Sequence, residues 1–161
     1  MVLSGRSRIK SPWMLHFDTG SCNGCDIEIW ALLSPRYDIE RFGILNKANP
    51  KHADILLVTG PVTRKVEDRL RLLYEQMPEP KLVVAVGDCA STGAPFSDCY
   101  NVNGGIGRVI PVDVFVPGCA ARPEAIIDGV VLALKTWKER KFSSKTKDET
   151  IKEPREREVR N

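Results

Sequence analysis

The sequence predicts an α/β fold in which helices cover both faces of a parallel sheet. Two almost wholly apolar segments, 53–59 and 81–86, have the composition of strands that are buried on both faces. One segment with helical periodicity, 63–76, separates them, and another, 122–138, follows later in the chain. Strands that alternate with helices along a chain typically pair in parallel, which sets the fold class.

The first expected element is a strand at 13–18, with the sequence WMLHFD. A loop of Gly, Ser, Cys and Asn residues follows it, and a helix is expected over about 26–33, before Pro35. After the apolar strand 53–59, the helix at 63–76 places four side chains on one face: Val66, Leu70, Leu73 and Tyr74.

The last expected strand is 112–116, VDVFV, and the last helix is 122–138. Pro123 suits the first turn of this helix, and its inward stripe consists of Ile126, Val130, Leu134 and Trp137. Together these elements predict one flavodoxin-like three-layer sandwich, with a parallel sheet of four or five strands, over residues 1–140.

Residues 141–161 differ in kind from the rest of the chain. They hold seven basic and five acidic residues and almost nothing apolar. Because such a segment cannot bury enough surface to fold alone, it predicts a charged C-terminal tail, either flexible or lying as a strap along a partner.

The composition indicates one domain in a reducing compartment. The chain has 161 residues, of which 42% are hydrophobic, and a net charge of +3, which is too small to indicate nucleic-acid binding. No run approaches the ~18 consecutive apolar residues of a membrane span, and the first residues lack the apolar core of a signal peptide. We therefore expect a cytoplasmic protein whose five cysteines are ligands or redox groups rather than disulfides.

Four of the five cysteines follow directly on expected strands. Cys22 and Cys25 come after the first strand, Cys89 after the second apolar strand and Cys119 after the last, while Cys99 stands apart in a loop. The carboxyl ends of parallel strands share one edge of a sheet, where ligands bind. The pattern C-x2-C … C … C therefore predicts four thiols at one site.

Several kinds of site fit this pattern. A lone C-x-x-C is typical of a thioredoxin-like dithiol, which leaves the placement of Cys89 and Cys119 to chance. Four thiolates also hold structural zinc, whose ligands usually come as two close pairs. An inert cysteine is the simplest interpretation of any one position, and we prefer it for Cys99. A [4Fe–4S] cluster accepts four widely separated thiolates, and glycines flank the cysteines in support of it: Gly20, Gly24, Gly87, Gly93 and Gly118.

Several motifs resemble a known family. They are GSCNGCDIEI, SPRYDIERFG, HADILLVTGPVT and IPVDVFVPGC followed by RPEAI. Over about residues 11–138 the chain is similar to the small, electron-transfer subunit of membrane-bound, energy-converting group 4 [NiFe] hydrogenases. That family is related to the 20-kDa iron–sulfur subunit of respiratory complex I. The resemblance places the ligands of one proximal [4Fe–4S] cluster at Cys22, Cys25, Cys89 and Cys119. The C-x2-C spacing resembles the hydrogenase branch, since the complex I subunit usually carries adjacent cysteines there.

The sequence departs from the family pattern at two places. The family usually reads PGCPPRPE, whereas this chain has Ala120 and Ala121 in place of the two prolines. The loop after Cys89 reads STGAPFSDC, where related chains often continue with Gly-Gly. These departures leave open a partner that reduces sulfur compounds instead of handling hydrogen.

The resemblance implies a subunit of an oxidoreductase complex without a complete active site of its own. The implied partners are a large catalytic subunit, a ferredoxin-like iron–sulfur subunit that supplies electrons, and membrane-arm subunits, with no nucleic acid. The implied place is the cytoplasmic side of the cell membrane, peripheral within the complex. The alternatives are a complex I-type module that reduces quinone and a zinc-bound interaction module. No phosphate-binding glycine loop and no plausible catalytic triad point elsewhere.

Three further side chains are candidates for supporting roles. Glu28 lies one helical turn after Cys25, where it either moves protons or docks a partner, or is only a carboxylate stabilised at a helix N-terminus. His16, on the first strand, is either a hydrogen-bonding neighbour of the cluster or, more simply, a core histidine. His52 lies near a strand edge and suggests no role.

Overall fold

A computed structural model describes residue 8 and residues 10–151 of the protein. For residues 139–151 it describes the backbone only. Five strands form one sheet, and all of their pairings are parallel. The strands are β1 (Trp13–Asp18), β2 (Leu45–Asn46), β3 (Ile55–Thr59), β4 (Leu82–Val86) and β5 (Val114–Val116). The predicted parallel α/β sheet is therefore confirmed.

The strand order is β2-β1-β3-β4-β5, the order of flavodoxin-like folds. The chain reverses direction across the sheet between β1 and β3, and ligands in such sheets bind beyond the carboxyl ends of the strands at this switch point. The register places four strand-end residues in one row across the sheet: Asp18, Thr59, Val86 and Val116. The loops that leave this row carry the four cysteines singled out by the sequence.

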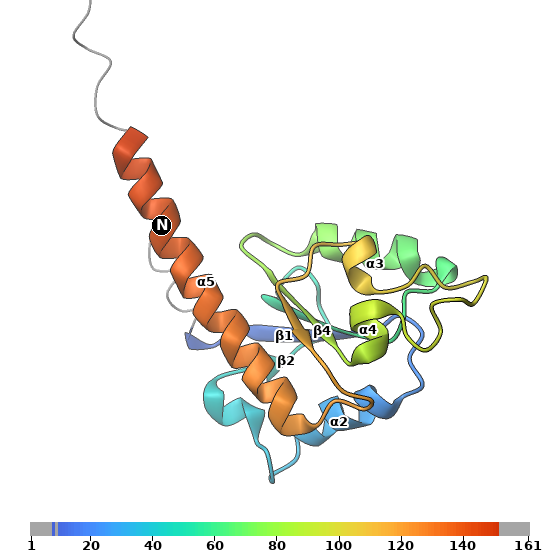
Figure 1. The fold of residues 1–161 in the computed structure, drawn as a ribbon. Coiled ribbons are helices and arrows are strands. Elements are labelled where there is room, and N and C mark those ends of the chain that lie inside the picture. The colour runs from blue at the N-terminus through green and yellow to red at the C-terminus, as the bar shows by residue number, and fades with distance from the viewer. Residues whose placement is uncertain (1–7, 9, 152–161) are drawn as a thin grey trace, which may run out of the picture.

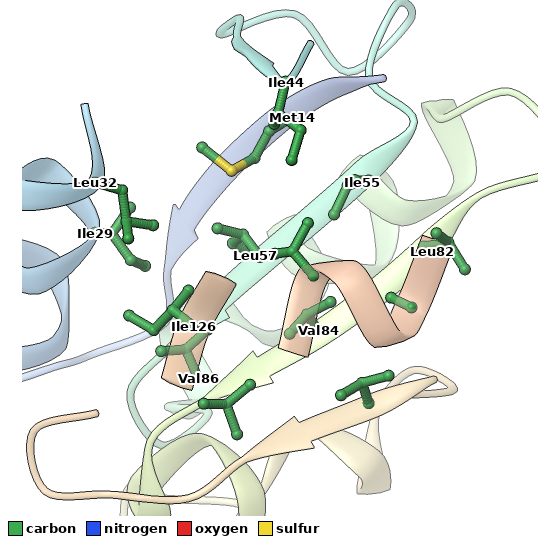
Figure 2. Close-up of a cluster of buried hydrophobic side chains, with 14 of the residues drawn as sticks. Met14, Ile29, Leu32, Ile44, Ile55, Leu57, Leu82, Val84, Val86 and Ile126 are labelled. Atoms are coloured by element: carbon green, nitrogen blue, oxygen red, sulfur yellow. The ribbon is translucent and has the colours of Figure 1, made fainter. Parts of the chain in front are cut away.

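Helices cover both faces of the sheet (Figure 1). One face packs against α2 (Gly24–Leu32), the 3-10 helix η1 (Ile39–Phe42) and α5 (Pro123–Ile151). Figure 2 shows Ile29 of α2 and Ile126 of α5 against Leu57 and Val84 of the sheet, all of them buried. The other face packs against α3 (Arg64–Gln76), α4 (Asp88–Thr92) and η2 (Ile106–Arg108). β3 and β4 are apolar along almost their whole length, and alternate residues of a strand face opposite sides of the sheet. Both faces are therefore apolar, as predicted from the continuous apolar segments.

The predicted inward stripe of the last helix is confirmed, but the predicted end of that helix is wrong. Ile126, Val130 and Trp137 are buried, and Leu134 packs partly buried against the same cluster. The helix was expected to end at Lys138, yet α5 continues to Ile151 and projects away from the sheet (Figure 1). Six of residues 139–151 are Lys, Glu or Arg, whose helix propensity is high, so the helix continues although the segment has few apolar residues.

The question of tail or strap stays a prediction. Residues 152–161 lie outside the described residues, and so do residues 1–7 and 9. Within the part of the chain that is described, no helix is both long and apolar enough to span a membrane.

The amino ends of the strands are joined by a buried carboxylate. Asp54, just before β3, accepts a hydrogen bond of 3.0 Å from the backbone N–H of Trp13 and pairs with the guanidinium of Arg8. Arg8 also lies over the ring of Trp137, 5.8 Å from its centroid. This carboxylate stands at the edge of the sheet opposite to the cysteine loops.

Candidate metal centre

The loop after β1 is shaped by the last residue of that strand. One carboxylate oxygen of Asp18, Oδ1, accepts hydrogen bonds from the backbone N–H groups of Gly20 (2.7 Å) and Ser21 (2.6 Å). This turn leads the chain to Cys22, which is exposed, and to Cys25 in the first turn of α2, which is half-buried. A strand-end carboxylate thus fixes where the first two thiols stand.

A second carboxylate joins the loops of the other two thiols. The Oδ1 atom of Asp88 accepts a hydrogen bond of 2.9 Å from the N–H of Gly118, while its own N–H donates to the Gly118 carbonyl at 3.1 Å. Cys89 follows Asp88 in the first turn of α4, and Cys119 follows Gly118 beyond β5. This reciprocal pair brings the two cysteines to the same edge.

The four thiols lie within electrostatic reach of one another. Burial raises the pKa of the Cys25 thiol, and negative charge on Cys22 and Cys119 raises it further. Burial likewise raises the pKa of Cys89, with added contributions from the other three cysteines of the set. Cys99 contributes to neither shift and is exposed in the loop after α4. The structure thus gathers the four cysteines at one edge and leaves the fifth outside.

The backbone packs directly against two of these sulfurs, at glycines whose missing side chains make the close approach possible. A Cβ on Gly87, whose φ is +91°, would stand 2.6 Å from the Cys25 sulfur. A Cβ on Gly24 would stand 3.5 Å from the Cys22 sulfur. Four thiols lined by bare backbone fit an iron–sulfur cluster, which takes Cys thiolates as ligands and backbone N–H groups near its sulfurs. Among the described residues, no three His, Cys, Asp or Glu side chains are placed to hold a single metal ion.

A buried carboxylate beside Cys25 is a feature that the sequence analysis missed. Asp26 is only 6% exposed, and its carboxylate accepts hydrogen bonds from the hydroxyls of Ser21 and Thr59, the latter at 2.6 Å. The Nε2 atom of His16 lies 2.8 Å from its Oδ1. Burial alone would raise the pKa of Asp26, but the Ser21 and Thr59 hydroxyls and His16 outweigh it, so the pKa is lowered.

The other singled-out side chains take different places. His16 hydrogen-bonds to this carboxylate and to Thr59 (3.2 Å), so it supports the cysteine loop rather than the apolar core. Glu28 is half-buried in the middle of α2. His52 packs its ring against Trp13, with centroids 5.6 Å apart, near the amino end of β1.

The family with the description "NADH ubiquinone oxidoreductase, 20 Kd subunit" matches residues 22–133, a range that contains all five cysteines. This chain belongs to that family. The predicted resemblance is therefore confirmed.

Similar proteins come from several branches of the family. The "probable membrane-bound hydrogenase subunit mbhJ" of Pyrococcus furiosus is 59% identical over 125 residues, which are 78% of this chain and 75% of that one. "Formate hydrogenlyase subunit 7" of Escherichia coli is 45% identical over 78% of this chain, which spans 49% of that protein. A chloroplastic "NAD(P)H-quinone oxidoreductase subunit K" of Spinacia oleracea is 47% identical over 80% of this chain and 56% of its own length. These relatives are named as subunits of oxidoreductases.

Solved structures support the same assignment. A chain of the membrane-bound sulfane sulfur reductase, an archaeal respiratory membrane complex, is 40% identical, with a TM-score of 0.72 over 83% of this chain and 73% of that chain. An NAD+-reducing [NiFe]-hydrogenase chain is 19% identical, with a TM-score of 0.57 over 72% of this chain and 86% of that chain, and it shares the fold alone.

One departure from the family pattern has a structural consequence. Ala121 is buried, and its backbone forms a hydrogen bond to Cys25 that lowers the pKa of that thiol, against the larger effect of burial. Proline at this position, which the family usually has, would lack the N–H. The side chain of Ala120 lies against Gly24, 3.4 Å from where a Cβ on Gly24 would stand.

Proposed function

We propose that this protein is the electron-transfer subunit of a membrane-bound oxidoreductase complex, and that Cys22, Cys25, Cys89 and Cys119 hold one [4Fe–4S] cluster. The observation that carries the proposal is the meeting of four thiols from three strand-end loops at one edge of the sheet. A cluster bound there would supply one-electron transfer.

The residues of this chain would hold and surround the cluster. Asp18 and Asp88 fix the loops that present the thiols, and the buried strands behind them exclude water from one side. Cys22 and Cys119 are exposed, and so are two apolar side chains of α2, Ile27 and Trp30, which are 66% and 59% exposed. A partner that covers this edge would complete the exclusion of water.

The proposal includes the partners and the place that the family resemblance implied. A ferredoxin-like subunit would deliver electrons to this chain, and a large catalytic subunit would receive them. Membrane-arm subunits would anchor the complex, with this chain peripheral on the cytoplasmic side. The names of the similar proteins support a membrane-bound complex, since they include a membrane-bound hydrogenase and a respiratory membrane complex.

The substrate of the catalytic partner is proposed as hydrogen or a sulfur compound. The hydrogenase subunit mbhJ supports the first, and the sulfane sulfur reductase supports the second. The sequence of the partner large subunit decides between these substrates. Paired C-x-x-C motifs in that subunit would indicate a nickel–iron centre, and their loss would indicate another substrate. A complex I-type quinone module is the other candidate, supported by the match to NAD(P)H-quinone oxidoreductase subunit K. The C-x2-C spacing favours the hydrogenase-like branch.

Metal analysis tests the proposed cluster directly. Anaerobically purified protein is expected to carry about four irons and four acid-labile sulfides per chain, because a cubane holds that number. The reduced protein is expected to give an EPR signal that is absent after oxidation. Stoichiometric zinc without visible absorption would overturn the cluster and favour a zinc-bound interaction module.

The substitution Glu28→Gln tests whether this residue is part of a proton path. Gln keeps the shape and the hydrogen-bonding reach of the side chain but cannot titrate. If Glu28 carries protons for the partner, turnover of the assembled complex is expected to fall by about tenfold or more, as for lost acid–base groups. The EPR signal of the cluster is expected to stay unchanged. Full turnover with an unaltered signal would reject the proton role and leave a half-buried carboxylate in the middle of α2.

A further inference from the structure

The carboxylate of Asp26 is the buried charge that directly follows a proposed ligand, Cys25. We infer that Asp26 is a positioning and electrostatic residue whose fixed negative charge lowers the reduction potential of the cluster. This inference rests on the proposed function, since it needs a cluster at the four cysteines. It adds a second determinant of the site beyond the ligands themselves.

The contacts of Asp26 tie the helix of Cys25 to two strands. Its Oδ1 accepts a hydrogen bond of 2.6 Å from the hydroxyl of Thr59, the last residue of β3, and lies 2.8 Å from His16 Nε2 on β1. Its Oδ2 accepts from the Ser21 hydroxyl in the cysteine loop. Thr59 is fully buried, and Trp30 lies edge-on to His16 with ring centroids 6.4 Å apart. The carboxylate is therefore held in one place, at the switch point of the sheet.

The carboxylate stands next to the ligand loop. Asp26 directly follows Cys25 in the first turn of α2, and its Oδ2 accepts a hydrogen bond from Ser21, the residue before Cys22. Because the carboxylate is desolvated, its field is screened less than that of a surface charge. Reduction adds one electron to the bound cluster, and a nearby fixed anion makes that step less favourable.

The substitution Asp26→Asn removes the charge and keeps the shape. The Asn side-chain oxygen accepts from Thr59 and His16, and its amide group donates to the Ser21 hydroxyl, so the contacts persist. In a dithionite titration with mediators, followed by EPR on the chain in its native complex, the cluster is expected to be reduced more easily. The ratio of reduced to oxidised cluster at a fixed ambient potential is expected to rise by about tenfold, a shift of about 59 mV for a one-electron couple.

A second variant acts on the same carboxylate without touching its charge. Thr59→Val removes the hydroxyl that donates to Oδ1 and preserves the shape of the side chain. Because that hydrogen bond partly compensates the anion, its loss is expected to lower the potential, with the reduced fraction falling by about twofold. Thr59→Val also decides the question if Asp26→Asn carries no iron. An unchanged potential in Thr59→Val would then overturn the inference.

The matched control is Asp54→Asn. Asp54 is also a buried carboxylate, 3% exposed, but it lies before β3 at the opposite edge of the sheet. Its substitution is expected to lower the thermal midpoint and to leave the potential unchanged. Equal shifts in Asp26→Asn and Asp54→Asn would assign the effect to general loosening and overturn the inference. Unmodified protein without iron would instead overturn the proposed function, whereas iron-loaded Asp26→Asn with an unshifted potential would overturn only the role of Asp26.

Discussion

Replacing any one of Cys22, Cys25, Cys89 or Cys119 by Ala is expected to remove most of the bound iron. A cubane left with three protein thiolates has one open corner, which water and oxidants reach from the exposed side of Cys22 and Cys119. Since ligand binding contributes folding free energy, the thermal midpoint is expected to fall as well. Each kcal/mol of lost stability lowers the midpoint by about 2–4 °C in a chain of this size. Iron analysis and thermal unfolding of one preparation measure both effects.

The fifth cysteine, Cys99, provides the control for these substitutions. Cys99 is exposed in the loop after α4 and contributes to the pKa shift of neither Cys25 nor Cys89. Cys99→Ser is therefore expected to keep the full iron content and the midpoint. If Cys99→Ser loses iron while Cys119→Ala retains it, the ligand set is wrong. If all five variants retain iron, the metal lies elsewhere.

The fold was predictable where the sequence carries strong periodic signals. The strand at 13–18 was placed correctly to the residue, and the buried strands β3 and β4 differ from the prediction only at their first residues. The stripe of α5 ending at Trp137 was equally clear, because residues at helical spacing face the same core. Two short elements were not predicted from the sequence. β2 has only two residues and α4 only five, which are too few to show a periodic pattern.

The site was predictable in part, for a similar reason. Parallel strands bring their carboxyl ends to one edge, so cysteines that follow three strands must approach one another there. The contacts within the site were not predictable, because they join side chains far apart in the chain. Asp26 reads as a helix-start carboxylate, and nothing in the sequence marks its bonds to Thr59 and His16. The sequence analysis singled out Glu28 instead, two residues further along.

Gly87→Ala is expected to have the second large effect, although no ligand is changed. The φ of Gly87 is +91°, a backbone conformation that costs an L-residue about 1–3 kcal/mol. The added methyl carbon would also stand 2.6 Å from the Cys25 sulfur, nearer than real Cβ atoms approach other atoms. Either the Cys25 sulfur, which is itself a proposed ligand, or the first turn of α4, which holds the proposed ligand Cys89, must move. We expect the variant to lose most of its iron and to unfold at a lower temperature.

Gly107→Ala is the matched control for this substitution. Gly107 lies in η2 on the other face of the sheet, its φ is outside the left-handed region, and an added Cβ would meet only the Phe115 ring, at 3.8 Å. That distance is ordinary van der Waals contact, so Gly107→Ala is expected to keep all its iron and to change stability by no more than about 1 kcal/mol. Iron content, the EPR signal and the thermal midpoint are measured on both variants. Full iron in Gly87→Ala would mean that the cluster does not depend on close packing of the backbone at Gly87 against the Cys25 sulfur.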